Sequence, residues 1–336
     1  MTHGAGAPIL VMGAGSVGCW IGGALAAAGA PVVFVGRPRV LDALAQAGLT
    51  VSDLDGRREH LAPASLRVAA EVPAGLAPRL VLFTVKSGAT AQAAAQLASA
   101  LPAATPVLSL QNGIGNTERA RAAAPGLVWL PGLVPYNIAE LGPGHFHRGT
   151  GGALAAEDHP ALRAALPDFE RARLKLKLHP DLRALQWGKL LMNLNNPVNA
   201  LSGLPLRAQL LDRGYRVCLA ALQAEALAAL KAAGIEPAQI GALPPRRVPW
   251  LLRLPTPIFK RVAARMLRID DAARSSMADD LRLGRPTEID AFCGEVVRLA
   301  AAHGARAPRN EIISTLIDAW AGQPMPAPAL RRALRL

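Results

Sequence analysis

The chain has 336 residues and a formal net charge of +13 at pH 7, from 37 Lys and Arg against 24 Asp and Glu. Hydrophobic residues make up 51% and charged residues 18%, which is enough apolar material for a buried core and excludes global disorder. A chain of this length is typical of two domains. The basic residues are scattered and aromatic residues make up only 4%, so the charge favours small anionic ligands and we predict no nucleic-acid partner.

Cysteine and histidine usage indicates neither disulfide bonds nor a metal. The three cysteines, Cys19, Cys218 and Cys293, are odd in number and show no CxxC spacing, as in proteins of a reducing cytosol. His145 and His147 flank a Phe with no carboxylate or Cys at ligand spacing, so no metal site is expected.

Residues 1–36 carry no charged side chain, a feature that a signal peptide or a membrane anchor would share. A basic n-region is missing, however, and Gly and Pro interrupt the segment repeatedly. A buried strand–helix–strand unit explains the same composition. We therefore predict a soluble cytoplasmic protein with no membrane partner.

The first half of the chain alternates short apolar runs with helical segments. Strands are expected at 8–12, 31–35, 79–85, 106–110 and 127–131, and helices at 16–29, 88–100 and 116–124. Strands separated by helices predict a parallel sheet with right-handed crossovers, that is, a Rossmann-type, doubly wound α/β domain over residues 1–180. The Gly-rich, alternating segment 144–156 is expected to form antiparallel edge strands.

Beyond about residue 181 the strand signals fade. Long Leu- and Ala-rich segments predict helices at 182–203, 206–233, 256–269, 275–283, 288–303 and 309–322. Prolines between 244 and 257 indicate a loop-rich connection among them. We therefore place a domain boundary near residue 180 and predict an all-α C-terminal domain over residues 181–336.

A glycine motif follows the first predicted strand. Gly13, Gly15 and Gly18 form a GxGxxG pattern, with Ser16 and Val17 at the start of the helix. Between a strand and a helix, these glycines permit a tight turn, close approach of a dinucleotide pyrophosphate and close packing of helix on strand. The helix N-terminus then offers free N–H groups to phosphate, so we predict a dinucleotide site here.

The end of the second predicted strand indicates which dinucleotide is bound. An NAD-dependent enzyme usually has Asp or Glu at this position to bind the ribose hydroxyls. This chain instead has Gly36, which leaves room beside the ribose, and then Arg37, whose guanidinium can pair with a 2′-phosphate. We predict NADP(H); Arg39 either assists or is a surface charge.

Two more strands of the predicted sheet end in polar residues. Lys86 follows the strand 79–85, and Gln111-Asn112-Gly113 follows the strand 106–110. Ligands of open α/β sheets bind at the carboxyl ends of the strands. Lys86 and Asn112 are therefore candidate ligand contacts.

The predicted helix 182–203 carries polar residues among leucines. Lys189 and Asn193 are four residues apart, and Asn196 is seven from Lys189, so all three are predicted to share one helix face. Pro197 removes one helical hydrogen bond and leaves the Asn193 carbonyl without its usual donor. A polar binding site would account for such groups.

A last group of polar residues starts at Ser275-Ser276-Met277. A Gly-Arg-Pro break then ends one helix, and Thr287 with Asp290 predicts the N-terminal cap of the next. Glu288 would lie in the first turn, where a carboxylate complements the helix dipole even without an active site.

These motifs, in this order, resemble the ketopantoate reductase (2-dehydropantoate 2-reductase) family from about residue 8 to residue 320. The resemblance implies NADPH-dependent reduction of the C2 carbonyl of ketopantoate to pantoate, as in pantothenate biosynthesis. It also implies the site residues. Lys189 is the general acid and Glu288 is the carboxylate near the substrate hydroxyl and cofactor. Asn112, Asn193, Asn196 and Ser276 are substrate contacts, whereas Arg37, Lys86, Asn112 and the glycine loop with Ser16 and Val17 bind the cofactor.

One departure from the family pattern leaves the substrate open. The family often has an Asn eight residues after the general-acid lysine, directly before a proline, whereas this chain has Pro197 there and Asn196 one residue earlier. The same chemistry on a different small 2-oxo acid is therefore an alternative, and a non-catalytic NADPH-binding redox sensor is a second one. The sequence does not fix the oligomeric state, and a homodimer is compatible with it.

Overall fold

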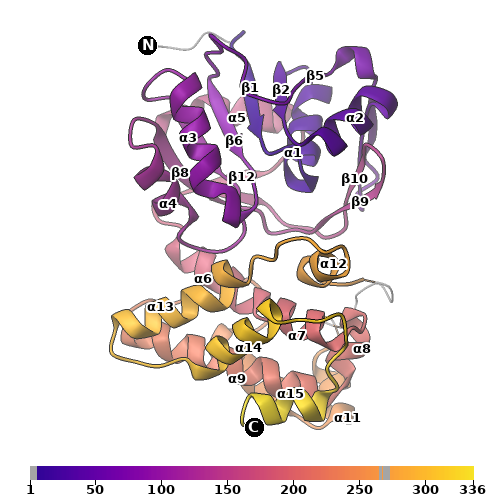
Figure 1. Cartoon of the computed structure of the whole chain (residues 1–336), viewed down its shortest axis with the longest axis vertical. Coiled ribbons are helices and arrows are strands. Elements are labelled where there is room, and N and C mark those ends of the chain that lie inside the picture. Colours follow the sequence, from indigo (N-terminus) through magenta and orange to yellow (C-terminus); the bar gives the residue numbers. More distant parts are fainter. Residues whose placement is uncertain (1–5, 265–266, 268–272) are drawn as a thin grey trace. The chain divides into compact units, whose positions relative to one another are not determined.

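The chain divides into two compact units, Met1–Leu182 and Arg183–Leu336. A computed structural model describes residues 6–264, 267 and 273–336. The first unit contains strands and helices, whereas every regular element in the described part of the second is helical (Figure 1). The α/β class of the first half and the helical class of the second are as predicted.

The large sheet of the first unit is mainly parallel. In the described residues its eight strands are β1 (Ile9–Met12), β2 (Val32–Val35), β5 (Arg67–Ala69), β6 (Leu80–Phe83), β7 (Pro106–Ser109), β8 (Val128–Leu133), β11 (Leu154–Glu157) and β12 (Leu176–His179). Their order is β12-β11-β8-β7-β6-β1-β2-β5. β11 runs antiparallel to β8 and parallel to β12. The strand order reverses at β1, which lies between β2 and β6 and is parallel to both.

Helices cover both faces of this sheet because its central strands are apolar on both sides (Figure 1). Ile9 and Val11 belong to one buried cluster, and Leu10 and Met12 belong to another on the opposite face. The helices of the unit are α1 (Ser16–Ala27), α2 (Pro38–Ala47), α3 (Thr90–Ala100), α4 (Asn116–Ala123) and α5 (Pro160–Arg171).

A second sheet in the first unit was not predicted. It has the order β4-β3-β10-β9, with β3 (Leu49–Asp53), β4 (Arg58–Leu61), β9 (Ile138–Gly142) and β10 (His145–Arg148). The segment 144–156 does pair antiparallel, β10 with β9 and β11 with β8. The prediction of edge strands was wrong, because β10 also pairs with β3 and β11 also pairs with β12. Trp20 of α1 donates a 2.8 Å hydrogen bond to the Ser52 carbonyl and fixes α1 against this sheet.

The second unit consists of short and medium helices in its described part: α6 (Arg183–Asn193), α7 (Asn195–Ser202), α8 (Leu206–Leu211), α9 (Arg213–Ala232), α10 (Val248–Arg253), α11 (Thr256–Val262), α12 (Ser276–Arg282), α13 (Glu295–Ala302), α14 (Pro308–Asp318) and α15 (Ala327–Ala333). The predicted helices 182–203 and 206–233 are each divided in two, at Leu194 and Asp212. Prolines in the predicted loop-rich region start α10 and α11. Residues 265, 266, 268 and 269 of the predicted helix 256–269 lie outside the described residues.

Helix α6 packs closely against the segment after α9. The Ala238 N–H donates a 2.8 Å hydrogen bond to the Ala184 carbonyl. A Cβ on Gly188 would overlap the Ala238 carbonyl oxygen, so only glycine fits at this crossing. Gln223 of α9 donates a 2.9 Å hydrogen bond to the Leu191 carbonyl and fixes the same helix from another side.

Replacing Gly188 by Ala should destabilise the protein by about 1–3 kcal/mol, because the added methyl group overpacks a backbone contact. Urea unfolding measures the change in the free energy of unfolding. Gly241→Ala is the matched control, since a Cβ at Gly241 would meet nothing within 4 Å. Equal unfolding midpoints for the two variants would contradict the packing argument.

Candidate functional site

The glycine loop after β1 is fixed by backbone contacts that exclude side chains. Gly13 has φ +106°, and a Cβ there would overlap the Val85 backbone. A Cβ on Gly18 would overlap the Gly13 carbonyl oxygen and Thr84 Oγ1. Thr84 Oγ1 in turn donates a 2.7 Å hydrogen bond to the Gly13 carbonyl. These contacts fix the loop between β1 and α1 against the end of β6.

Gly15 differs from its two neighbours in the motif, because nothing lies within 4 Å of the position that its Cβ would occupy. It is exposed and is the N-cap residue of α1. Ser16, Val17 and Gly18 form the first turn, where helix geometry leaves the N–H groups without intrahelical acceptors. The first turn of α1 also contains no acidic residue. This helix end can therefore accept an anion that approaches along the backbone of Gly15.

Two arginines stand at the N-terminus of α2, where the helix dipole disfavours cations. Arg37 is the N-cap residue and Arg39 follows Pro38 in the first turn. Arg39 forms a bidentate pair with Glu140, at 2.8 and 2.9 Å, and these hydrogen bonds raise the pKa of Arg39. Arg37 is exposed and pairs with no carboxylate of the described residues. An anionic ligand would offset the charge of Arg37, whereas Glu140 already offsets that of Arg39.

The remaining predicted residues of the first unit lie at the same edge of the sheet, because β1, β2, β6 and β7 are parallel. Lys86 lies just beyond the end of β6, and Asn112 lies just beyond the end of β7. Lys86 is exposed and Asn112 is half-buried. The structure thus brings together Lys86, Asn112, Arg37 and the glycine loop at the carboxyl edge, on either side of the strand-order reversal.

Gln111 has a structural role that the sequence did not reveal. Its side-chain amide donates hydrogen bonds to the Val85 carbonyl at 2.9 Å and to Thr90 Oγ1 at 2.8 Å, and its Oε1 accepts one from Ser109 at 3.0 Å. These bonds link the ends of β6 and β7 to the start of α3. Gln111 thereby sets the backbone position of the neighbouring Asn112.

In the second unit, Lys189 lies on α6 directly after the tightly packed Gly188. Burial lowers the pKa of Lys189 to about 8, and the nearby carboxylate of Glu288 opposes part of this change. The electrostatic interaction places Lys189 and Glu288 near each other, although they are far apart in the sequence. A lysine in this state can give up a proton near neutral pH.

Asn193 and Asn196 do not share one continuous helix. Asn193 is the last residue of α6 and Asn196 lies in the first turn of α7, with Leu194 between the two helices. The predicted helix is therefore divided after Asn193, but Leu194 keeps helical dihedral angles, and the shared face of the three residues stays a prediction. Both asparagines are half-buried.

Ser276 is placed by its neighbour Ser275. Ser275 caps α12 through a 3.2 Å hydrogen bond from the Ala278 N–H, and its own hydroxyl donates to the Asn196 carbonyl at 3.3 Å. The side chain of the fully buried Asn199 accepts a 2.9 Å hydrogen bond from the Ser275 N–H. Ser276 is therefore an exposed residue at the start of a helix that is fixed on the helix carrying Asn196.

The predicted cap around Glu288 forms only in part. Thr287 Oγ1 accepts a long 3.5 Å hydrogen bond from the Ile289 N–H. Asp290 instead pairs with Arg298 at 2.7 Å and begins a π-helical turn, η4 (Asp290–Gly294), that leads into α13. Glu288 thus precedes the helical segment rather than lying in its first turn. It is half-buried there, outside any helix or strand, and its charge interacts with that of Lys189.

The described residues form neither a metal site of clustered ligands nor a membrane-spanning helix. Within residues 6–264, 267 and 273–336, no group of three or more His, Cys, Asp or Glu could hold a metal ion. No described helix is both long and apolar enough to cross a membrane.

Known proteins resemble the chain along most of its length. The family model "Ketopantoate reductase PanE/ApbA" matches residues 9–160, and its C-terminal counterpart matches residues 181–321. A 2-dehydropantoate 2-reductase of Mesorhizobium japonicum is 28% identical, over 92% of this chain and 96% of that protein. One from Pyrococcus horikoshii is 26% identical, over 93% and 96%.

Solved structures resemble the chain over both of its units. A PanE/ApbA family ketopantoate reductase of Ralstonia eutropha JMP134 has a TM-score of 0.78 and 28% identity, covering 93% of this chain and 97% of that one. D-mandelate dehydrogenase, in a ternary structure with NADH and anilino(oxo)acetate, has a TM-score of 0.74 over 93% and 97%. Its 19% identity makes this a likeness of fold alone. From the family models, relatives and structures together, the chain belongs to the ketopantoate reductase family of oxidoreductases.

Proposed function

We propose that this protein is an NADPH-dependent 2-dehydropantoate 2-reductase, which reduces the C2 carbonyl of ketopantoate to the hydroxyl of pantoate. The observation that carries the proposal is Lys189, whose pKa is lowered by burial to about 8 beside Glu288, in a chain of the ketopantoate reductase family. The relatives from Mesorhizobium japonicum and Pyrococcus horikoshii bear the name of this activity.

The residues of the first unit fit a phosphorylated dinucleotide. The open side of Gly15 and the first turn of α1 suit a pyrophosphate. Arg37 at the start of α2 suits a 2′-phosphate, because that anion would offset a cation at a helix N-terminus. Lys86 and Asn112 would hold the nicotinamide half at the carboxyl ends of β6 and β7. When bound, NADPH supplies the hydride for the substrate carbonyl.

The residues of the second unit then stabilise the negative charge on the carbonyl oxygen and supply its proton. As the carbonyl carbon is reduced, negative charge develops on its oxygen, and the Lys189 ammonium stabilises this charge and donates the proton. General acid catalysis of this kind typically contributes about 100- to 10,000-fold to the rate. Glu288 accepts a hydrogen bond from the hydroxyl region of the substrate and helps to keep Lys189 charged. Asn193, Asn196 and Ser276 supply the remaining polar contacts.

A different small 2-oxo acid is the second candidate substrate. Asn196 lies one residue before Pro197, in the first turn of α7, rather than at the position that the family pattern favours. A one-residue shift in a helix turns a side chain by about 100°, so the contacts at this end of the substrate differ. The hydride and proton transfers would be the same for either acid.

The first experiment is to follow NADPH oxidation spectroscopically with ketopantoate and a panel of small 2-oxo acids, using NADH as the control cofactor. We expect ketopantoate to give the highest kcat/KM, and NADPH to be preferred to NADH. A higher kcat/KM for another acid would contradict ketopantoate as the substrate, but it would be consistent with the same hydride and proton transfers. Tight NADPH binding without turnover of any acid would instead support a non-catalytic redox sensor.

Arg37→Gln should raise the KM for NADPH roughly tenfold or more and leave that for NADH unchanged, because it removes a charge-assisted bond to the 2′-phosphate. Arg39→Gln removes the same charge two residues away, but Arg39 is already paired with Glu140. The KM for NADPH should therefore change little in this control. Equal effects of the two substitutions would show that Arg37 has no specific role.

The kcat/KM for the 2-oxo acid should fall as the pH rises above about 8. The reason is that Lys189, with its pKa lowered to about 8, loses the proton that it must donate. Lys189→Arg should move this decline to higher pH, because a guanidinium stays charged. Lys189→Ala should lower kcat by about 100- to 10,000-fold while NADPH still binds.

The exposed Lys231 of α9 provides the matched control for these substitutions. Lys231→Ala should keep the pH profile and kcat of the unmodified protein. An unchanged profile in Lys189→Arg, or unchanged turnover in Lys189→Ala, would remove Lys189 from the mechanism.

A further inference from the structure

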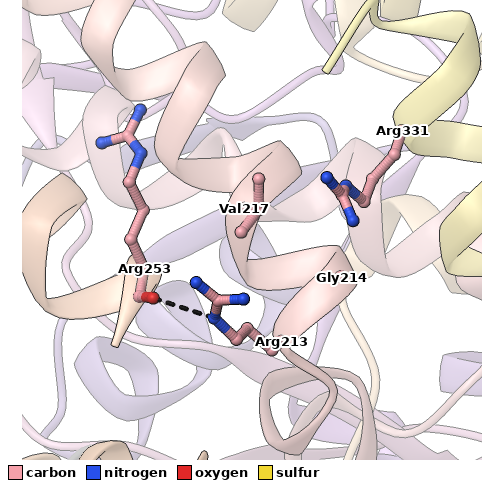
Figure 2. A pocket seen from close by; sticks show the side chains of 5 residues that line it. All are labelled: Arg213, Gly214, Val217, Arg253 and Arg331. Carbon is pink, nitrogen blue, oxygen red and sulfur yellow. Dashed lines mark hydrogen bonds between the residues drawn. The ribbon is translucent and has the colours of Figure 1, made fainter. Parts of the chain in front are cut away.

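Three arginines of the second unit line a pocket of about 310 Å³ that is distinct from the residues of the candidate site. Arg213 comes from the start of α9, Arg253 from the end of α10 and Arg331 from α15. Gly214 and Val217 of α9 complete the lining (Figure 2). The pocket therefore forms where three helices meet, and its charged groups come from each of them.

Two of the three guanidinium groups are directed into this space. In Figure 2, those of Arg213 and Arg331 lie on different sides of Val217 and point toward the region between them. Arg213 Nε donates a 3.0 Å hydrogen bond to the Arg253 carbonyl, which fixes its direction. The guanidinium of Arg253 instead donates to the Pro249 carbonyl at 3.1 Å and to the Ala220 carbonyl at 3.4 Å. Arg253 thus lines the pocket without directing its guanidinium into it, and the guanidinium groups of Arg213 and Arg331 are the two cations available to a ligand.

The described residues provide no carboxylate partner for these arginines. Within residues 6–264, 267 and 273–336, no Asp or Glu oxygen lies within 4.0 Å of a side-chain nitrogen of Arg213, Arg253 or Arg331. Exposed arginines elsewhere do find such partners, as Arg298 does with Asp290 at 2.7 Å. The nearby carboxylate of Asp212 caps α9 through a 2.7 Å hydrogen bond from the Gly214 N–H.

A fourth arginine adds to the positive charge from below the surface. Arg216 is fully buried and donates hydrogen bonds to the carbonyls of Leu210, Leu252 and Leu254, at 2.8 to 3.1 Å. Its guanidinium also lies 4.1 Å from the ring centre of Phe259. Burial lowers the pKa of Arg216, and the charge of Arg213 lowers it further. Arg216 thus donates to backbone carbonyls and to Thr256 Oγ1, and no carboxylate of the described residues forms an ion pair with it.

We propose that this pocket binds a small phosphate-bearing anion. A phosphoryl group has several oxygens that point in different directions, so it can accept from two guanidinium groups that approach from separate helices. A planar carboxylate matches a single guanidinium fork better. The volume is at the lower end of the range for ligand sites, which suits a phosphate or diphosphate group with a small organic part. The proposal does not depend on the substrate of the reductase.

Isothermal titration of the full chain with inorganic pyrophosphate, at saturating NADP⁺, tests the site. Arg331→Gln should raise the Kd for pyrophosphate roughly tenfold or more, because one of two charge-assisted contacts is lost. Arg332→Gln is the matched control: it removes the same charge from the next residue of α15, which is also exposed but does not line the pocket. It should leave the Kd within about twofold.

A second variant separates shape from charge. Val217→Trp should fill the pocket without changing any charge, and pyrophosphate binding should be lost while the reductase reaction is unchanged. Equal weakening in Arg331→Gln and Arg332→Gln would overturn the proposal, because it would show a diffuse effect of charge. Binding of malonate as tight as that of pyrophosphate, or no pyrophosphate binding at millimolar concentration, would also overturn it.

Discussion

The close contact between Gly18 and the Gly13 carbonyl is the constraint on which the first unit depends. Because neither glycine carries a side chain, α1 starts directly against the end of β1, and Thr84 can reach the Gly13 carbonyl from the end of β6. The two central strands and the first helix are thereby fixed where the strand order reverses. Gly15, in the same loop, makes no such contact, and its open side is what a ligand could use. One short motif thus separates glycines required for packing from a glycine available for binding.

At Lys189, a property that the proposed chemistry uses lowers the stability of the fold. Its pKa falls from 10.5 to about 8 because burial disfavours the ammonium, so the folded protein binds this proton more weakly than the unfolded chain does. The resulting cost to stability is fully present below pH 8 and declines as the pH rises toward 10.5. Packing around Gly188 and the Gln223 bond to the Leu191 carbonyl hold α6 in place despite this cost. Glu288 reduces the cost without removing it.

Local sequence patterns predicted the helices, strands and turns that depend on residues close together in the sequence. The buried strands Ile9–Met12 and Leu80–Phe83 and the glycine turn were accessible for this reason. The second sheet was not, because the Ser52 contacts to His145 and His147 span 93 and 95 residues and no local signal specifies such a pairing.

The helix break at Leu194 follows from Pro197, which lacks the N–H that would bond to the Asn193 carbonyl. That missing bond was recognised in the sequence, but the division of the helix that follows from it was not. Asp290 does not cap the helix as predicted, because its carboxylate pairs instead with the guanidinium of Arg298, eight residues later.

The distribution of carboxylates decides which cations are available to ligands. Arg39 and Arg37 stand two residues apart at one helix end, and Glu140 pairs with the first and not with the second. Around α9, Asp212 is engaged in capping the helix, so Arg213 and Arg331 face the pocket without it. A net charge of +13 guarantees that many arginines lack partners, but it does not determine which ones converge. Convergence comes from the fold, in which the buried Arg216 of α9 donates to carbonyls in and after α10, and α15 packs against α9. A cation that is both unpaired and positioned by such contacts is better prepared to bind an anion than one that is only exposed.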